Sequence, residues 1–126
     1  MMPGITFDAG GLIALDRNDR RVVALPTRAE ETHATVTVPA TALAQAIRRP
    51  DRQARLARLL RQPTTVVQDL DRVDATHVGR LLAASRTTDI ADAHVVICAR
   101  RARTGVVTSD PTDLRRLDPQ LALTVI

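Results

Sequence analysis

The chain has 126 residues, 44% of them hydrophobic and 25% charged, with a formal net charge of +4 at pH 7. These values exclude a disordered chain and are typical of one globular domain, so we expect residues 1–126 to fold as a single unit. No apolar run is long enough to cross a bilayer, the amino terminus lacks the layout of a signal peptide, and the lone Cys98 has no partner for a disulfide. We therefore expect a cytoplasmic protein without a membrane partner.

The charged residues are unusual in kind. All 18 basic residues are arginine, and 12 of the 14 acidic residues are aspartate. The planar guanidinium suits phosphate, which makes an arginine-rich chain a reasonable nucleic-acid binder, although a coding bias toward Arg, Ala and Val is an alternative explanation. Phe7 is the single aromatic residue, so the chain lacks stacking platforms for single-stranded nucleic acid.

Five short runs of β-branched and aliphatic residues predict strands. They cover residues 5–7, 34–40, 64–70, 106–110 and 121–126. The segments between them predict helices, with Pro26 expected to kink or split the helix over 20–32 and Gly105 to end the helix over 89–102. Other helices are predicted around 12–15 and over 41–48, 50–60, 71–82 and 111–117. Strands alternating with helices imply parallel pairing, hence a three-layer α/β/α domain with a parallel central sheet of four to five strands.

Five aspartates fall at places that such a sheet would bring together. Asp8 ends the first strand, Asp110 ends the fourth with Asp113 three residues later, and Asp89 and Asp92 begin the helix that leads into the fourth strand. If the first and fourth strands are neighbours, these carboxylates meet beyond the carboxyl edge of the sheet. Repulsion would then protonate some of them or recruit a cation, and oxygen-only ligands select a hard ion, Mg²⁺ or Mn²⁺.

Helix capping is the alternative explanation for the same residues. Asp89 is a good N-cap with Asp92 at the third helical position, and Asp110 and Asp113 repeat this spacing. Capping accounts for either pair taken alone. It does not account for Asp8 and both pairs together.

Four segments resemble a known family in their order and spacing. They are FDAGGLIAL (7–15), VPATALAQA (38–46), DIADAHVV (89–96) and VVTSDPTDL (106–114). Together they resemble a PIN domain, specifically a VapC-type toxin of bacterial toxin–antitoxin pairs, over essentially the whole chain. The resemblance implies a PIN-like fold and an endoribonuclease that uses Mg²⁺ or Mn²⁺ to hydrolyse RNA. It also implies a small VapB-type antitoxin as partner and frequent homodimerisation.

The resemblance also assigns roles to the acidic residues. By position, Asp8, Asp92 and Asp110 correspond to the acids that hold the metal, and Asp113 matches a further acid found in many members. Asp89 is an extra carboxylate close by, which could add a metal ligand or position water. In the chemistry that the family implies, a metal-activated water attacks phosphorus in line and leaves a 5′-phosphate and a 3′-hydroxyl.

One position departs from the family pattern. Gln45 stands where the family usually has a glutamate, and an amide can orient water but cannot accept a proton or supply charge. Asp89 is the candidate to restore that charge. Gln45 also supports a second interpretation, a catalytically weakened PIN-like protein that acts mainly by binding an antitoxin or RNA.

Other classes and residues fit less well. Phosphoacceptor signalling domains and haloacid-dehalogenase-like phosphatases need a lysine, which this chain lacks, and flap nucleases need additional helices for which there is no room. His94 follows Asp92 by two residues, about 200° around a helix, so we expect it to point away from the acids.

The segment 47–62 predicts a broad basic helical face opposite leucines, either solvated or in contact with RNA or the antitoxin. Its arginines are Arg48, Arg49, Arg52, Arg55, Arg58 and Arg61.

Overall fold

The structure is a computed structural model that describes residues 4–126. Its strands are β1 (Ile5–Phe7), β2 (Val36–Pro39), β3 (Thr65–Gln68), β4 (Gly105–Thr108) and β5 (Leu123–Val125). Its α-helices are α1 (Ala9–Asp16), α2 (Leu25–Glu31), α3 (Ala40–Ala46), α4 (Ala54–Arg61), α5 (Arg72–Ser85), α6 (Ile90–Ala102) and α7 (Pro111–Leu117). Within residues 4–126, no helix combines the length and apolar character that crossing a membrane requires.

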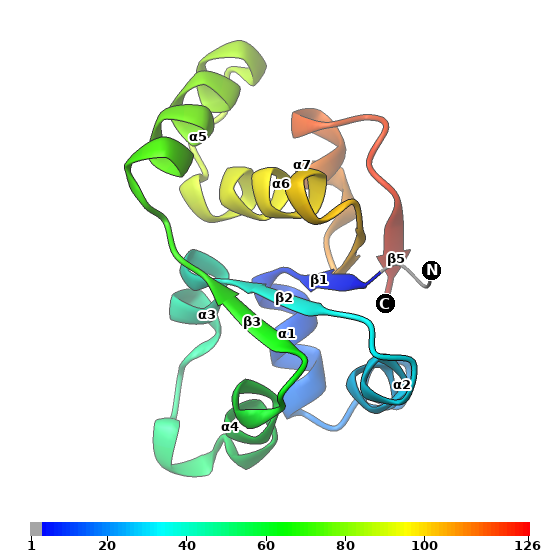
Figure 1. The fold of residues 1–126 in the computed structure, drawn as a ribbon. Helices are drawn as coiled ribbons and strands as arrows, with labels where there is room; N and C mark the ends of the chain where they lie inside the picture. The colour runs from blue at the N-terminus through cyan, green and yellow to red at the C-terminus, as the bar shows by residue number, and fades with distance from the viewer. Residues whose placement is uncertain (1–3) are drawn as a thin grey trace.

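The five strands form one sheet in the order β3-β2-β1-β4-β5, and every pair of neighbours is parallel. Figure 1 shows α5, α6 and α7 on one side of this sheet and α1, α2 and α4 on the other. The three-layer architecture with a parallel central sheet is therefore confirmed. The condition on which the predicted acidic site depended is also met, because β1 and β4 are paired.

The core lies on both faces of the three central strands. Phe7, Val36, Val38 and Val106 are fully buried there, and helices cover both faces of the sheet. Strands buried on both faces need a continuous apolar run, which explains the short unbroken hydrophobic segments of the sequence. Each fully buried side chain of this size stabilises the fold by about 1.5–3 kcal/mol relative to exposure.

The adjacent Gly10 and Gly11 let α1 begin directly against β4. A Cβ atom at Gly11 would lie 2.5 Å from the carbonyl oxygen of Val107, and one at Gly10 would lie 2.2 Å from the Ser109 hydroxyl. The Ser109 hydroxyl can rotate away, but the Val107 carbonyl oxygen belongs to the backbone of β4, so the position of Gly11 requires glycine. The close packing keeps Asp8, at the start of α1, beside the end of β4.

Three predicted helices have different limits from those expected. Pro26 lies in the first turn of α2 and does not kink a longer helix, because proline at this position lacks only an amide that would be unbonded anyway. Arg103, in the left-handed conformation with φ 57°, ends α6, and Gly105 is already in β4. The segment 50–60 is divided into the 3-10 helix Pro50–Arg52 and α4, and buried Gln53 accepts hydrogen bonds from the amides of Arg48 and Arg49 there.

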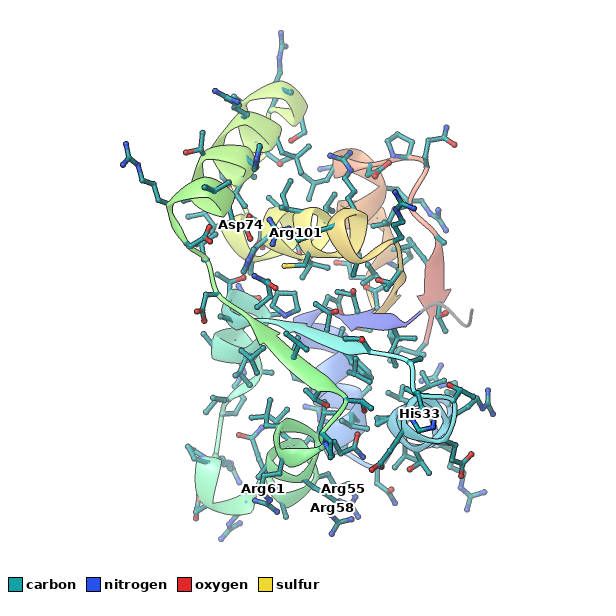
Figure 2. All side chains as sticks on the ribbon, in the orientation of Figure 1. His33, Arg55, Arg58, Arg61, Asp74 and Arg101 are labelled. Carbon is teal, nitrogen blue, oxygen red and sulfur yellow. The ribbon has the colours of Figure 1, made fainter. Side chains whose placement is uncertain are left out.

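The broad basic face predicted for residues 47–62 is therefore wrong in its extent. Only Arg55, Arg58 and Arg61 belong to α4, opposite the buried Leu56 and Leu59. Figure 2 shows these three side chains at the outer end of the molecule, on the α4 side of the sheet. The remaining arginines of the segment lie in the preceding loop and 3-10 helix.

Candidate active site

The pairing of β1 with β4 sets two acids side by side at the carboxyl edge of the sheet. Phe7 is in register with Val107, and the Asp8 amide donates to the Val107 carbonyl oxygen at 3.3 Å. Asp8 and Asp110 each follow the last residues of their strands. The pairing of β1 with β4 thus places Asp8 and Asp110 at the same edge of the sheet, as the sequence predicted.

Asp8 is a buried carboxyl held by its surroundings. Only 6% of the residue is exposed, and its Oδ1 accepts a hydrogen bond from the Gly11 amide at 2.7 Å. Burial raises the pKa of Asp8 above its usual value, and the negative charge of Asp110 raises it further, against hydrogen bonds from the Thr108 hydroxyl and from the Gly11 and Gly10 amides. The hydrogen bonds therefore hold the side chain in place, while burial and the charge of Asp110 destabilise its ionised form.

The pKa of Asp92 is affected by the charges of the other four aspartates at this edge of the sheet. Asp92 lies in the first turn of α6, and its amide donates to Asp89 Oδ1 at 2.9 Å. Its pKa is raised to about 7, first by burial and then by the charges of Asp89, Asp8, Asp113 and Asp110. A helix amino terminus would lower this pKa, so burial and like charge together outweigh the helix dipole. The structure thus brings all five predicted aspartates into one electrostatically coupled cluster, which we call the acidic cluster.

Capping explains part of this cluster and not the rest. Asp89 does cap α6, and Asp8 caps α1. Asp110 occupies the N-cap position of α7 but makes no capping hydrogen bond through its side chain. Capping therefore does not explain the carboxylate of Asp110.

Thr108 is a member of the site that sequence reasoning missed. Its hydroxyl oxygen accepts a hydrogen bond from the Asp110 amide at 3.0 Å, and the hydroxyl hydrogen-bonds to the Asp8 carboxyl. The side chain is fully buried at the end of β4 and ties the two strand-end acids together. The signal in the sequence was a polar residue closing an otherwise apolar strand, directly before two further polar residues.

Two hollows adjoin the cluster. One, of about 260 Å³, is lined by Asp89, Asp92 and Asp113 together with Arg86 and Arg116. Three acidic and two basic residues thus line the same space.

Gln45 lies outside that hollow. It is exposed on α3 and lines a neighbouring hollow of about 410 Å³ with Thr41, Asp89 and Ile90. Asp89 is an acid that the two hollows share. The amide therefore borders the acidic cluster on the Asp89 side only.

The donor set of the cluster fits a hard divalent cation. Across residues 4–126, the carboxylates that form salt bridges with arginine belong to Asp19, Asp74 and Asp118, so no arginine pairs with the five acids of the cluster. Only carboxylate oxygens are offered, and oxygen-only sites suit Mg²⁺ or Mn²⁺. In the same part of the chain, no three of these carboxylates place oxygens within 4.8 Å of one another, so ligation requires side-chain rotation toward a common centre.

His94 is buried and lies away from the acidic cluster, as expected from its angle on the helix. Its ring hydrogen-bonds to Thr41 and faces Asp74 on α5. The imidazole is thus not part of the candidate active site.

The fold and the acidic cluster define an α/β protein with a candidate divalent-cation site at the carboxyl edge of a parallel sheet. No family model and no curated protein matches the sequence. Solved structures that match in fold include the following two. One is VapBC2 from Rickettsia felis, in a crystal structure in which it is bound to a DNA fragment from its promoter. Its TM-score is 0.65 at 14% identity, over 96% of this chain and 97% of that chain. PAE2754 from Pyrobaculum aerophilum gives a TM-score of 0.65 at 16% identity, over 98% of this chain and 92% of that chain. These similarities confirm the PIN-like fold.

Proposed function

We propose that the chain is a metal-dependent endoribonuclease, the toxin of a VapBC-type toxin–antitoxin pair. The observation that carries this proposal is the environment of Asp92, a half-buried carboxyl whose pKa is raised to about 7 by burial and by four neighbouring carboxylates. Groups with strongly perturbed pKa values that lie together in a hollow are typical of functional sites. The similarity in fold to VapBC2 supports the assignment to a toxin–antitoxin pair.

Asp8, Asp92 and Asp110 are the residues that would hold Mg²⁺ or Mn²⁺, with Asp89 as an additional carboxylate. When bound, such an ion stabilises charge on the scissile phosphate and lowers the pKa of a bound water. Ion binding would also remove the repulsion that raises the pKa of Asp92, so the cluster and the cation stabilise each other.

The remaining residues of the hollow have roles that follow from their charge. A carboxylate oxygen of Asp113 can orient the attacking water and accept its proton. Arg86 and Arg116 line the same hollow and can bind the phosphates on either side of the scissile bond. If water attacks phosphorus and the bond to the 3′-oxygen breaks, the 3′-oxygen leaves and takes up a proton, which gives a 5′-phosphate and a 3′-hydroxyl; because water is the nucleophile, the reaction needs no 2′-hydroxyl.

The partner in this proposal is a VapB-type antitoxin, and the assembly includes a homodimer of the chain in the cytoplasm. In the Rickettsia felis crystal structure, VapBC2 is bound to a DNA fragment from their promoter, which supports a DNA-bound toxin–antitoxin complex by analogy. The arginines of α4 offer one place for the antitoxin: Arg55 and Arg58 line a groove of about 370 Å³ with Leu15, Val23 and Pro26. An antitoxin segment with apolar and acidic side chains would complement this groove.

Cleavage of RNA by the purified chain tests the proposal. We expect cleavage in Mg²⁺ or Mn²⁺ that leaves 5′-phosphates, that tolerates 2′-deoxy substitution at the scissile nucleotide, and that falls at least about 100-fold in Asp8→Asn and Asp92→Asn. Asp51→Asn is the matched control, because Asp51 is an exposed aspartate of the 3-10 helix outside the acidic cluster. Equal cleavage by the wild type and Asp8→Asn would identify a contaminating nuclease and contradict the proposal.

A second candidate function is binding without efficient catalysis, and Gln45 is the observation that favours it. Its amide supplies no charge at the position where a glutamate is usual, and it is exposed beside Asp89. If the endoribonuclease proposal is correct, Gln45→Glu should raise the cleavage rate or the affinity for Mn²⁺ by severalfold. If binding is the function, the wild type and Gln45→Glu should both bind RNA or antitoxin and neither should cleave.

A further inference from the structure

A second group of metal-ligand side chains lies apart from the acidic cluster, between α5 and α6. Asp74 on α5 and His94 and Cys98 on α6 are all buried, with at most 1% of each residue exposed. One ligand atom from each lies within 4.8 Å of the others. Figure 2 shows Asp74 between α5 and α6, next to Arg101. The proposed nuclease site uses none of the three.

The imidazole of His94 has one satisfied and one unsatisfied nitrogen. Nδ1 lies 2.7 Å from the Thr41 hydroxyl oxygen, while Nε2 has no hydrogen-bond partner and lies 3.8 Å from Asp74 Oδ2. A buried polar atom without a partner costs about 1–3 kcal/mol. In the tautomer whose Nδ1–H donates to Thr41, Nε2 carries the lone pair and lies on the side of Asp74. Metal-binding histidines are characteristically held in this way through their other nitrogen.

The spacing along α6 suits a shared ion. His94 and Cys98 are four residues apart and therefore lie one turn apart on the same face of the helix. Their nitrogen and sulfur atoms, with a carboxylate oxygen from the facing helix, form a mixed ligand set that favours Zn²⁺ over Mg²⁺. Ligation at about 2.0–2.1 Å for nitrogen and about 2.3 Å for sulfur requires the three atoms to move closer by small side-chain rotations.

We propose that Asp74, His94 and Cys98 form a transition-metal site, filled by Zn²⁺, that clamps α5 to α6. The protein ligands are an Asp74 carboxylate oxygen, His94 Nε2 and the Cys98 thiolate, and the fourth tetrahedral position is left for water. Binding of one Zn²⁺ releases one proton from the thiol, since burial raises the pKa of Cys98 to about 12 and keeps it protonated without metal.

Arg101 is the competitor for this site. Its guanidinium donates to both oxygens of Asp74, at 2.9 Å from Nη1 to Oδ2 and through a second close contact from Nη2 to Oδ1, and it holds the pKa of Asp74 below its usual range. A carboxylate has about four lone-pair positions, so two remain. The Arg101 side chain is 46% exposed and can also turn into solvent. Its positive charge nevertheless opposes the ion, so Arg101→Gln should tighten Zn²⁺ binding.

Cobalt substitution of the full chain tests the site without reference to RNA cleavage. Chelator-treated protein titrated with Co²⁺ should show a thiolate-to-Co²⁺ charge-transfer band and the visible bands of a tetrahedral ion, at one ion per chain. Zn²⁺ should displace this ion and excess Mg²⁺ should not. The band should persist in Asp8→Asn, because the acidic cluster offers only oxygens and gives no thiolate band.

Variants separate this site from a purely structural ion pair. Cys98→Ala, a small change in a helix already rich in alanine, should abolish the charge-transfer band, and Thr41→Val should weaken binding by about 10–100-fold through the loss of the hydrogen bond that orients His94. The absence of a thiolate band in both the wild type and Arg101→Gln would overturn the proposal. That result would leave Asp74 and Arg101 as a structural pair and His94 as a packing residue, and it would not affect the proposed nuclease site.

Discussion

Asp92→Asn should stabilise the metal-free protein at alkaline pH. The folded chain raises the pKa of Asp92 from 3.8 to about 7, so the carboxylate is disfavoured in the fold relative to the unfolded chain. Between these values the unfolded state binds fewer protons than the folded state, and stability therefore falls as pH rises through this window. Above about pH 7 the full cost is present, and replacing the carboxyl by an amide removes it.

The size of the effect can be bounded. The difference between 3.8 and about 7 corresponds to at most roughly 4 kcal/mol at about 1.36 kcal/mol per pH unit. Asp92 is only half-buried, so solvent and salt screen much of the repulsion, and we expect a gain of about 1–2 kcal/mol at 0.15 M salt. For a chain of this length that corresponds to a rise of roughly 4–8 °C in the midpoint of thermal unfolding.

Urea unfolding in EDTA, followed by circular dichroism at pH 8 and at pH 5, measures the effect. The advantage of Asp92→Asn should be smaller at pH 5 than at pH 8, because the wild-type carboxyl takes up protons in the folded state as the pH falls through this window. Asp51→Asn should change stability by less than about 0.5 kcal/mol at both pH values, as expected of an exposed substitution. A variant that is destabilised at pH 8, or whose advantage does not depend on pH, would refute the electrostatic account of the acidic cluster.

Three further predictions concern residues around the cluster. Arg116→Gln should raise KM for RNA by about 5–10-fold with a smaller change in kcat and a shallower salt dependence, whereas Arg115→Gln, next to it on α7 but outside the hollow, should do neither. Thr108→Val should raise the pKa of Asp8 by removing a hydrogen bond to its ionised form, so the acid limb of the pH–activity profile should move to higher pH; an unmoved limb would exclude this role. Gly11→Ala should destabilise the fold by about 1–3 kcal/mol in urea unfolding, because its Cβ would lie 2.5 Å from a β4 carbonyl oxygen; an unchanged midpoint would show that α1 can shift away.

The sequence predicts the sheet and the acidic cluster because both depend on local signals. Short apolar runs mark the strands, and aspartates at the ends of the first and fourth runs mark the carboxyl edge once those strands are paired. The same reasoning correctly directs His94 away from the acids, since the angle between two residues on one helix is fixed by its pitch.

Other features depend on contacts between distant segments. Nothing local indicates that the Thr108 hydroxyl connects Asp8 to Asp110, or that Gln53 folds back on the amides before it and divides the expected helix. The grouping of Asp74 with His94 and Cys98 depends on how α5 crosses α6, which the pattern of neither helix specifies. Pro26 was ambiguous, because proline both breaks helices and begins them.

Helix α6 carries Asp92 in its first turn toward the acidic cluster, while His94 and Cys98 project from another side toward α5. An insertion or deletion of one residue before this helix's middle would turn everything beyond it by about 100° relative to the first turn. Asp92 could then no longer face the acidic cluster while His94 and Cys98 face α5. The orientation of α6 about its own axis is thus fixed by the acidic cluster and by α5 together. Insertions and deletions that preserve the fold should therefore be confined to the loops on either side of α6.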